Sequence, residues 1–411
     1  MKRRVVITGC SSITPIGQTK KEILKSLENG VSGVKPLKDD GLLTKLIHCK
    51  VFGTVDYKVE YDFKRMFRKT MGPVSFYACK TAQEALENSG LEQAFITSGR
   101  LGVAFGSTHG SPTVQRSIYK TFFSESRKEL SSIGAVDYLK SMTHTTAVNI
   151  TKMFGITGRV ISSSTACTTG SQSIGFGYEM VKYGMQDAML CGGADEYDTT
   201  TVAVFDNLLA CSTDFNDTPS LTPRPFDVKR DGLVVGEGAG TVILEEYESA
   251  KKRGANILGE IIGFSCNNNG GDLILPNKDG IIKTIQLGLA DAKVNPEDID
   301  FISAHATATK MGDVIEAQAI SNVYGDTPLV TGLKSYNGHT MGSCGAVETI
   351  MTLYMMEKGF IAPTLNLENI DERCSMIRHA TELTEMKIKN ATIQNFAFGG
   401  VNTCLVLSSE F

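Results

Sequence analysis

The chain has 411 residues, enough for two or three structural units of ordinary size. Its apolar content of 41%, charged content of 21% and net charge of −4 are ordinary for a globular protein and give no sign of a nucleic-acid partner. No apolar run approaches the roughly 20 residues that a membrane-spanning helix needs, so we expect no membrane span.

The cysteines and histidines argue against disulfides and metal sites. The ten cysteines are scattered without a Cys-x-x-Cys pair, which is typical of a reducing compartment, so we expect a cytoplasmic protein. None of the six histidines has metal-ligand spacing, and no glycine cluster has the form of a dinucleotide or P-loop motif. We therefore predict neither a metal nor a cofactor.

Short apolar runs alternate with helix-length segments along the whole chain, which predicts an α/β protein with buried strands. The predicted strands of the first half are residues 5–9, 101–106, 160–163, 188–193 and 240–245. Those of the second half are residues 257–264, 299–305, 329–332, 391–396 and 403–408. The predicted helices are residues 75–89, 171–183, 280–292 and 346–358, with another at 245–253 before Gly254. No linker separates residues 1–249 from 250–411, so we predict two similar halves that share one core.

Cys167 is a candidate nucleophile because of its local setting. An apolar, β-branched stretch precedes it and a helix-like stretch follows, which puts the cysteine on a strand-to-helix turn. Amides of the helix's first turn and the positive end of the helix dipole favour a thiolate at such a position. The alternative is a buried structural cysteine, which is the commoner case for a lone cysteine in a cytosolic chain.

Two histidines follow strand-like runs in the second half. His305 ends the predicted strand 299–305, and His339 comes shortly after the short strand 329–332. Either histidine alone is more often a structural residue. Both stand at strand ends, where open α/β sheets place their sites, and with a thiolate they would form an acyl-transfer site.

Four ordered motifs resemble those of the β-ketoacyl-acyl-carrier-protein synthases. They are Thr165-Ala166-Cys167, the block from His305 to Glu316, Lys334-Ser335-x-x-Gly338-His339, and the run from Asn395 to Gly400. The resemblance extends from Arg4 to Leu407, almost the whole chain. It implies the α/β thiolase fold, a duplicated α-β-α-β-α layering with the active site between the halves. It also implies a homodimer, or a heterodimer with a chain-length-factor subunit.

The resemblance assigns the reacting groups. Cys167 would accept an acyl group from an acyl carrier protein, with the amides of Cys167 and Phe398 as oxyanion hole. His305 and His339 would donate to the thioester carbonyl of the malonyl carrier protein and stabilise the enolate left by loss of carbon dioxide. The product would be a β-ketoacyl thioester two carbons longer.

Supporting residues are assigned in the same way. Lys334 would be a buried electrostatic partner of the site with Glu316 as its counter-charge, a pair that keeps His305 oriented. Thr307 and Thr309 resemble residues that bind the pantetheine arm, and Phe398 and Gly399 belong to the same substrate-binding set. Ordinary β-branched packing is the alternative for the two threonines.

Five further polar residues have two readings each. The cations Lys64, Arg68 and Lys69 are predicted to dock the acidic carrier protein, against the alternative of a solvated charged face. Asp313 is either a site residue or a helix N-cap. Arg224 either lies beside the site or braces its loop.

The chain departs from the family pattern at two positions. Ala306 replaces a glycine after the first histidine, and we expect a backbone conformation there that alanine tolerates rather than a positive φ. Ala397 replaces a glycine before Phe398, which acts as a gate in relatives, so the gate is expected to be stiffer. Neither change removes a reacting group.

Three rival interpretations fit the sequence less well. A chain-length factor would lack the active cysteine, and a degradative thiolase would carry a second catalytic cysteine near the C-terminus, where Cys404 has the wrong context. A non-catalytic carrier-protein scaffold would not need the whole reacting set. The motifs look closest to elongating synthases of fatty-acid, aryl-polyene and similar polyketide pathways.

Overall fold

The computed structural model describes residues 3–56, 63–124 and 126–411. Within this part, one sheet of 11 strands has the order β12-β10-β9-β14-β15-β8-β1-β7-β6-β4-β5. Its strands are β1 (Val5–Ile13), β4 (Leu101–Gly106), β5 (Val160–Ile161), β6 (Ala188–Asp195), β7 (Gly238–Glu246), β8 (Gly259–Asn268), β9 (Phe301–Ser303), β10 (Leu329–Thr331), β12 (Arg378–His379), β14 (Asn390–Phe396) and β15 (Val401–Ser408). Two small sheets pair β2 (Val34–Pro36) with β3 (Val51–Gly53) and β11 (Phe360–Ile361) with β13 (Thr384–Glu385).

The pairing pattern shows that the fold is duplicated. From β1 outward, β7 and β6 pair antiparallel and then β4 and β5 pair parallel. From β8 outward, β15 and β14 pair antiparallel and then β9 and β10 pair parallel. Strands β1 and β8 join the two sets antiparallel. The expected duplicated α/β architecture is therefore confirmed.

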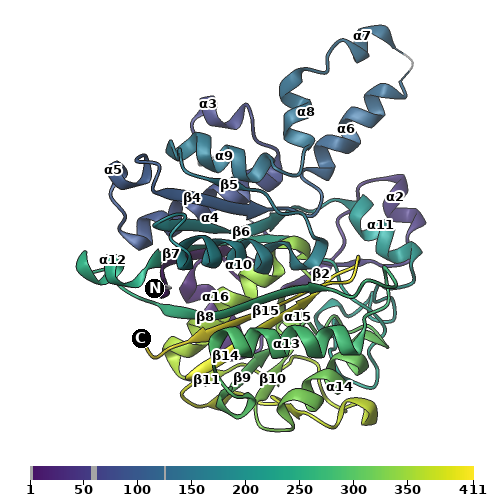
Figure 1. Cartoon of the computed structure of the whole chain (residues 1–411). Helices are drawn as coiled ribbons and strands as arrows, with labels where there is room; N and C mark the ends of the chain where they lie inside the picture. Colours follow the sequence, from purple (N-terminus) through teal and green to yellow (C-terminus); the bar gives the residue numbers. More distant parts are fainter. Residues whose placement is uncertain (1–2, 57–62, 125) are drawn as a thin grey trace.

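Helices lie between and outside the two sets of strands (Figure 1). In the first half they are α1 (Lys20–Asn29), α2 (Leu42–Leu46), α3 (Arg65–Arg68), α4 (Pro73–Ser89), α5 (Gln93–Ile96), α6 (Pro112–Phe122), α7 (Arg127–Leu130), α8 (Ala135–Ser141), α9 (Thr145–Phe154), α10 (Thr169–Lys182), α11 (Thr199–Asn207) and α12 (Tyr247–Lys252). The second half has α13 (Lys278–Ala292), α14 (Gly312–Tyr324), α15 (Lys334–Asn337) and α16 (Cys344–Lys358). Helices α10 and α16 form the central layer, while α6, α7 and α8 extend away from the body.

The central helices approach each other closely because glycines line their contact. A Cβ added at Gly170 of α10 would lie 2.9 Å from the Gly342 carbonyl oxygen and 3.0 Å from the Ala346 nitrogen. A Cβ at Gly345 of α16 would lie 2.7 Å from the Ser171 Cβ. The N-terminal ends of both helices, and the residues just before them, are thus brought together in the interior.

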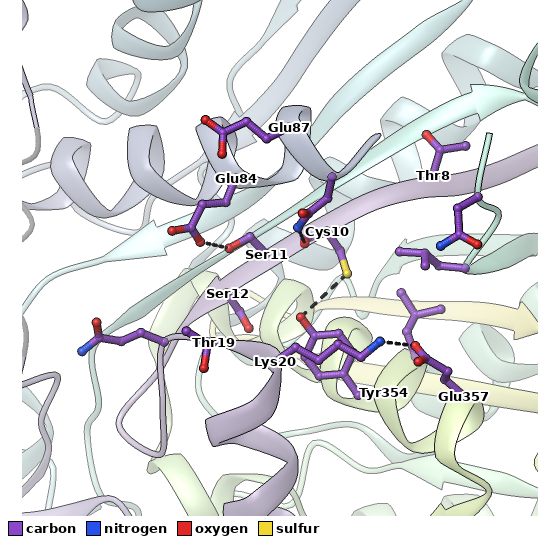
Figure 2. Close-up of a pocket in the computed structure, with 15 residues that line it drawn as sticks. Thr8, Cys10, Ser11, Ser12, Thr19, Lys20, Glu84, Glu87, Tyr354 and Glu357 are labelled. Carbon is purple, nitrogen blue, oxygen red and sulfur yellow. Dashed lines mark hydrogen bonds and ion pairs between the residues drawn. The ribbon is translucent and has the colours of Figure 1, made fainter. Parts of the chain in front are cut away.

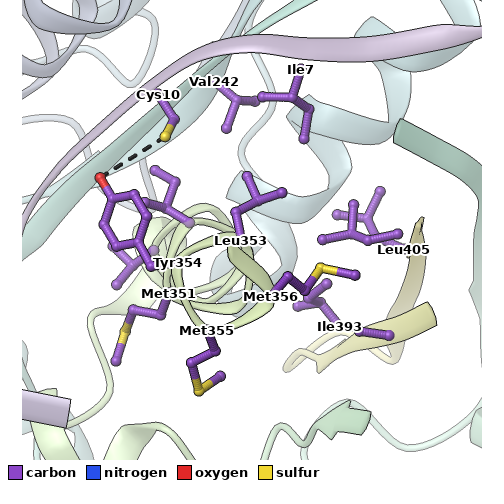
Figure 3. Packing of buried hydrophobic residues seen from close by; sticks show 14 of the residues in the cluster. Ile7, Cys10, Val242, Met351, Leu353, Tyr354, Met355, Met356, Ile393 and Leu405 are labelled. Carbon is purple, nitrogen blue, oxygen red and sulfur yellow. Dashed lines mark hydrogen bonds between the residues drawn. The ribbon is translucent and has the colours of Figure 1, made fainter. Parts of the chain in front are cut away.

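The largest core cluster surrounds α16, which is buried along nearly its whole length (Figure 3). Met356 projects from this helix toward Ile393 and Leu405, while Leu353 lies on the side of Val242 and Met355 points away from these strand residues. Because apolar side chains on all faces of a helix require burial on all faces, the sequence of α16 fits only the central layer.

Most predicted elements are present with small changes at their ends. The strand at 101–106 is unchanged, and the predicted 5–9 continues to Ile13 in β1. The helix predicted at 245–253 is α12, which Glu246 caps with its side chain and which ends before Gly254. The helices α6 to α9 were not predicted. No helix of the described residues is long and apolar enough to cross a membrane.

The close contact of the central helices predicts an effect on stability. Gly170→Ala should lower the free energy of unfolding by about 1–3 kcal/mol, since the added methyl group forces the helices apart. Gly271→Ala is the control, because a Cβ there meets only one atom, at 3.9 Å. Urea denaturation measures both variants. Equal stability of the two would contradict the close contact.

Candidate active site

Cys167 lies at the entrance to α10, as the sequence predicted. It belongs to the 3₁₀ helix η2 (Ala166–Thr168), which continues directly into α10, and only 7% of its surface is exposed. The backbone N–H groups of Cys167 and Phe398 both lower the pKa of its thiol, which places the two amides near the sulfur. Two amides that converge on one atom can stabilise negative charge on a neighbouring oxygen.

The thiol is not held as a thiolate in the free protein, in contrast to our expectation from the helix dipole. Burial raises the pKa of Cys167 to about 11, and the lowering effects of Lys334 and of the two amides are smaller. The reason is that transfer of a charged sulfur into an apolar interior outweighs the favourable dipoles around it.

His305 follows β9, and hydrogen bonds from the backbone at this position hold it in place. Its N–H donates to Glu316 Oε1 at 2.7 Å, and the N–H of Ala306 donates to Glu316 Oε2 at 2.7 Å. The ring packs against Phe396, and its Nδ1 is buried without a hydrogen-bond partner. Burial and the nearby Lys334 lower the pKa of His305 well below its ordinary value, so the ring is neutral.

His339 has a defined tautomer. The N–H of Met341 donates to its Nδ1 at 3.2 Å, so in the neutral ring the proton is on Nε2. Nε2 is buried without a partner. Burial and Lys334 lower the pKa of His339 well below its ordinary value. A neutral imidazole with a free N–H can donate to a carbonyl oxygen without carrying charge.

The three predicted reacting residues meet at one point. The sulfur of Cys167 and a ring nitrogen from each of His305 and His339 lie within 4.8 Å of one another, and the two rings are perpendicular with centroids 5.4 Å apart. A cysteine and two histidines are also possible zinc ligands. The absence of a metal therefore stays a prediction.

The counter-charge of Lys334 is Glu348, not Glu316 as predicted. Lys334 Nζ lies 2.6 Å from Glu348 Oε1, and both side chains are almost fully buried. Asn395 donates to the other oxygen of Glu348 at 2.8 Å. Burial alone would lower the pKa of Lys334, but Glu348 raises it, so the ammonium group stays charged.

Glu316 still orients His305, but through backbone amides. Burial raises the pKa of Glu316 to about 8, and the amides of Ala306 and His305 offset part of this rise. The expectation for Ala306 was wrong, because its φ is +38°. The hydrogen bond from the Ala306 N–H to Glu316 holds this strained conformation.

A cavity of about 450 Å³ leads to the reacting atoms. Thr307 and Thr309 line it, with their hydroxyl oxygens 3.1 Å apart, and Phe398 borders it while stacking on Phe205. Gly399 lies one residue further on and donates its N–H to the carbonyl of Leu273 at 2.7 Å. The cavity is mainly apolar and is polar at the threonines, which suits a flexible chain that ends in a thioester.

Asp313 and Arg224 are both structural by their contacts. Asp313 lies inside the first turn of α14 rather than at its N-cap, accepts the N–H of Phe226 at 2.8 Å and lies 3.7 Å from Arg230. Arg224 pairs with Asp227 at 3.2 Å and is buried in its loop. The loop-bracing reading of Arg224 therefore fits its contacts.

The predicted docking cations lie on and beside α3. Lys64 and Lys69 are exposed and Arg68 is half-buried. In Figure 1, α3 lies at the upper margin of the first half, apart from α14, whose first turn borders the cavity. Their role in docking stays a prediction.

A second cavity, between α1, α4 and α16, shares no lining residue with the first (Figure 2). Among the residues that line it, Ser11 donates to Glu84 at 2.6 Å, and Lys20 pairs with Glu357. We assign this cavity no part in the chemistry around Cys167.

Sequence reasoning missed Glu348 and Asn395, which complete the buried charge network. The available signal for Glu348 was its place in the mainly apolar stretch of residues 344–356. A carboxylate in such a helix is buried only when it is paired. Asn395 opens the last of the four family motifs, but the sequence analysis assigned it no role.

The comparisons agree with this geometry. Residues 2–250 match the family described as "Beta-ketoacyl synthase, N-terminal domain", and residues 258–368 match its C-terminal domain. The 3-oxoacyl-[acyl-carrier-protein] synthase 1 of Escherichia coli K12 is 33% identical over 410 residues, covering 98% of each chain. A β-ketoacyl synthase structure from Burkholderia phymatum is 41% identical with a TM-score of 0.94, covering 99% of each chain.

A more distant structure is described as a type II PKS acyl-carrier protein in complex with its ketosynthase bound to the hexaketide; it is 27% identical, has a TM-score of 0.91 and covers 99% of this chain and 100% of its own. The fold and site define a condensing enzyme of the thiolase fold. The chain belongs to the β-ketoacyl synthase family, and it is a ketosynthase of the acyltransferase type.

The raised pKa of Cys167 predicts the pH dependence of its alkylation. Only the thiolate reacts, so the rate with iodoacetamide should rise about tenfold per pH unit from pH 7 to 9. Cys167→Ala protein gives the background from other cysteines. An alkylation rate that levels off with a midpoint below pH 8 would mean that the helix dipole lowers the pKa of Cys167 more than burial raises it.

The buried ion pair predicts an order of stabilities. Glu348→Gln strands the charge of Lys334 in the interior and should cost about 3–5 kcal/mol. Glu316→Gln leaves no cation unpaired and should cost less. Denaturant midpoints of both variants test this, and the reverse order would mean that Glu316 is the counter-charge after all.

Proposed function

We propose that the enzyme joins malonyl units, delivered on an acyl carrier protein, to acyl chains held as thioesters on Cys167. Each reaction would lengthen the chain by two carbons. The observation that carries the proposal is the meeting of the Cys167 sulfur, two neutral histidines and two converging amides at the end of one cavity.

The first half-reaction is thioester exchange. The sulfur of Cys167 attacks the acyl carbonyl, whose oxygen becomes negative and accepts hydrogen bonds from the amides of Cys167 and Phe398. The bond to the pantetheine sulfur breaks, and the proton of the Cys167 thiol finally resides on that leaving sulfur. The acyl chain stays on Cys167.

The second half-reaction forms the carbon–carbon bond. The malonyl carboxylate leaves as carbon dioxide, and its electron pair becomes an enolate whose oxygen is stabilised by His305 and His339. The tautomer of His339 supports this role, since its free Nε2–H is a donor. The enolate carbon attacks the acyl-Cys167 carbonyl, and the sulfur of Cys167 leaves.

The carrier protein and the dimer are part of the same proposal. The name of the Escherichia coli relative includes acyl-carrier-protein, and the exposed cations Lys64 and Lys69 offer a contact for an acidic partner. We propose a homodimer, or a heterodimer with a chain-length-factor subunit, and a role in fatty-acid, aryl-polyene or related polyketide elongation. The presence of Cys167 speaks against a chain-length-factor or scaffold role for this chain.

Separate assays of the two half-reactions test the proposal. Cys167→Ala should lose acyl labelling by more than about a thousandfold, seen by intact mass after incubation with acyl carrier protein. His305→Ala and His339→Ala should keep labelling but suppress release of carbon dioxide from the malonyl carrier protein. A panel of saturated, polyenoyl and aryl-polyenoyl primers then identifies the substrate.

The control is Cys266→Ala, a half-buried cysteine outside the cavity, which should behave as the native enzyme. Acyl label on Cys167→Ala protein would overturn the assignment of the nucleophile. No carbon dioxide release by the native enzyme would revive the scaffold interpretation.

A further inference from the structure

The turn after His339 is strained and needs support. It consists of the 3₁₀ helix η5 (Met341–Ser343), and Met341 has a φ of +52° although it carries a Cβ. A residue in the left-handed region is stable only where its surroundings hold it there. The same Met341 supplies the N–H that fixes the tautomer of His339.

A buried carboxylate holds this turn from the other half of the protein. Asp195, at the end of β6, accepts the N–H of Gly342 on its Oδ2 at 2.7 Å. The same carboxylate accepts the hydroxyl of Ser107 at 2.9 Å and the hydroxyl of Thr108 at 2.8 Å. Only 4% of Asp195 is exposed, so these donors replace water around it.

We propose that Asp195 is a positioning residue for the condensation. By holding the Gly342 amide, it keeps Met341 in the conformation in which its N–H meets Nδ1 of His339. The Nε2–H of His339 then stays directed at the substrate carbonyl. The proposal rests on the function given to His339 above, and Asp195 acts without touching substrate.

The adjacent residue offers a matched control. Glu196 is equally buried, at 5% exposure, and follows Asp195 directly. Its carboxylate accepts the N–H of Val74 at 2.6 Å and the N–H of Thr113 at 3.0 Å, at the starts of α4 and α6. These bonds do not involve the turn after His339. Glu196→Gln therefore shows the effect of replacing a buried carboxylate that does not hold this turn.

The experiment compares Asp195→Asn with Glu196→Gln in the full-length enzyme. Oδ2 accepts from the Gly342 N–H and the Thr108 hydroxyl, and Oδ1 accepts from the Ser107 hydroxyl. Asparagine keeps one acceptor oxygen, so either Gly342 and Thr108 or Ser107 lose it, and in both cases the Gly342 N–H no longer bonds to a charged carboxylate. For Asp195→Asn, kcat for malonyl decarboxylation should fall on the order of tenfold to a hundredfold. KM for the malonyl carrier protein and acyl labelling of Cys167 should stay within about twofold.

A direct readout concerns the tautomer. In protein with 15N-labelled histidine, the Nδ1 and Nε2 shifts of His339, assigned with His339→Asn, should report the Nε2–H form in native and Glu196→Gln protein. In Asp195→Asn they should report a mixture. This measurement needs no substrate, so it separates a failure of the present proposal from a failure of the proposed function.

If Asp195→Asn does not fold, Gly342→Ala tests the same contact by a change on the side of the turn. A Cβ at Gly342 would lie 2.8 Å from Asp195 Oδ2, 2.8 Å from Thr108 Oγ1 and 3.0 Å from Thr169 Cβ, so the contact between the turn and the carboxylate must shift. The same selective loss of decarboxylation is expected. Unchanged decarboxylation in folded Asp195→Asn, an equal loss of both half-reactions, or an unaltered His339 tautomer would each overturn the proposal.

Discussion

The buried ammonium group of Lys334 is the charge on which the electrostatics of the site depend. Its salt bridge with Glu348 keeps it ionised in the interior. The same charge lowers the pKa of Cys167 and of both histidines. A single cation therefore favours an anionic sulfur and neutral imidazoles together, which is the combination that thioester exchange and enolate stabilisation require. The need to balance this charge explains why the buried part of α16 contains a carboxylate, Glu348.

Burial and the charge of Lys334 shift the pKa of Cys167 in opposite directions, but they shift the pKa values of the two histidines in the same direction. Removal of water raises the pKa of the thiol but lowers that of His305 and His339. The free enzyme thus rests with a thiol and two neutral rings. The same low-dielectric surroundings strengthen the amides of Cys167 and Phe398 once charge develops on a bound carbonyl oxygen. The site is therefore arranged to stabilise charge that forms during the reaction, rather than charge held before it.

The strands and the three reacting residues could be predicted because their signals are local. Apolar runs bounded by glycine mark β4 and β6, and the motifs around Cys167, His305 and His339 are contiguous in the sequence. The partner of Lys334 could not be predicted, since Glu316 and Glu348 are both acidic residues at similar distances along the chain. Only the folded structure, which brings Glu348 of α16 to 2.6 Å from Lys334 Nζ, decides between them. Similarly, the φ of Ala306 depends on a carboxylate ten residues away, which no local pattern reveals.

Each reacting residue lies beside a non-glycine residue with positive φ. Ala166 precedes Cys167, Ala306 follows His305, and Met341 lies two residues after His339. Such conformations cost on the order of 1–3 kcal/mol each, so the surrounding structure must hold them. At both histidines a buried carboxylate accepts the amide at or next to the strained residue: Glu316 at Ala306 and Asp195 at Gly342. The precision of the site thus depends on two buried acids that hold backbone amides. Loss of either acid releases a strained turn and misdirects its histidine while every reacting atom is still present.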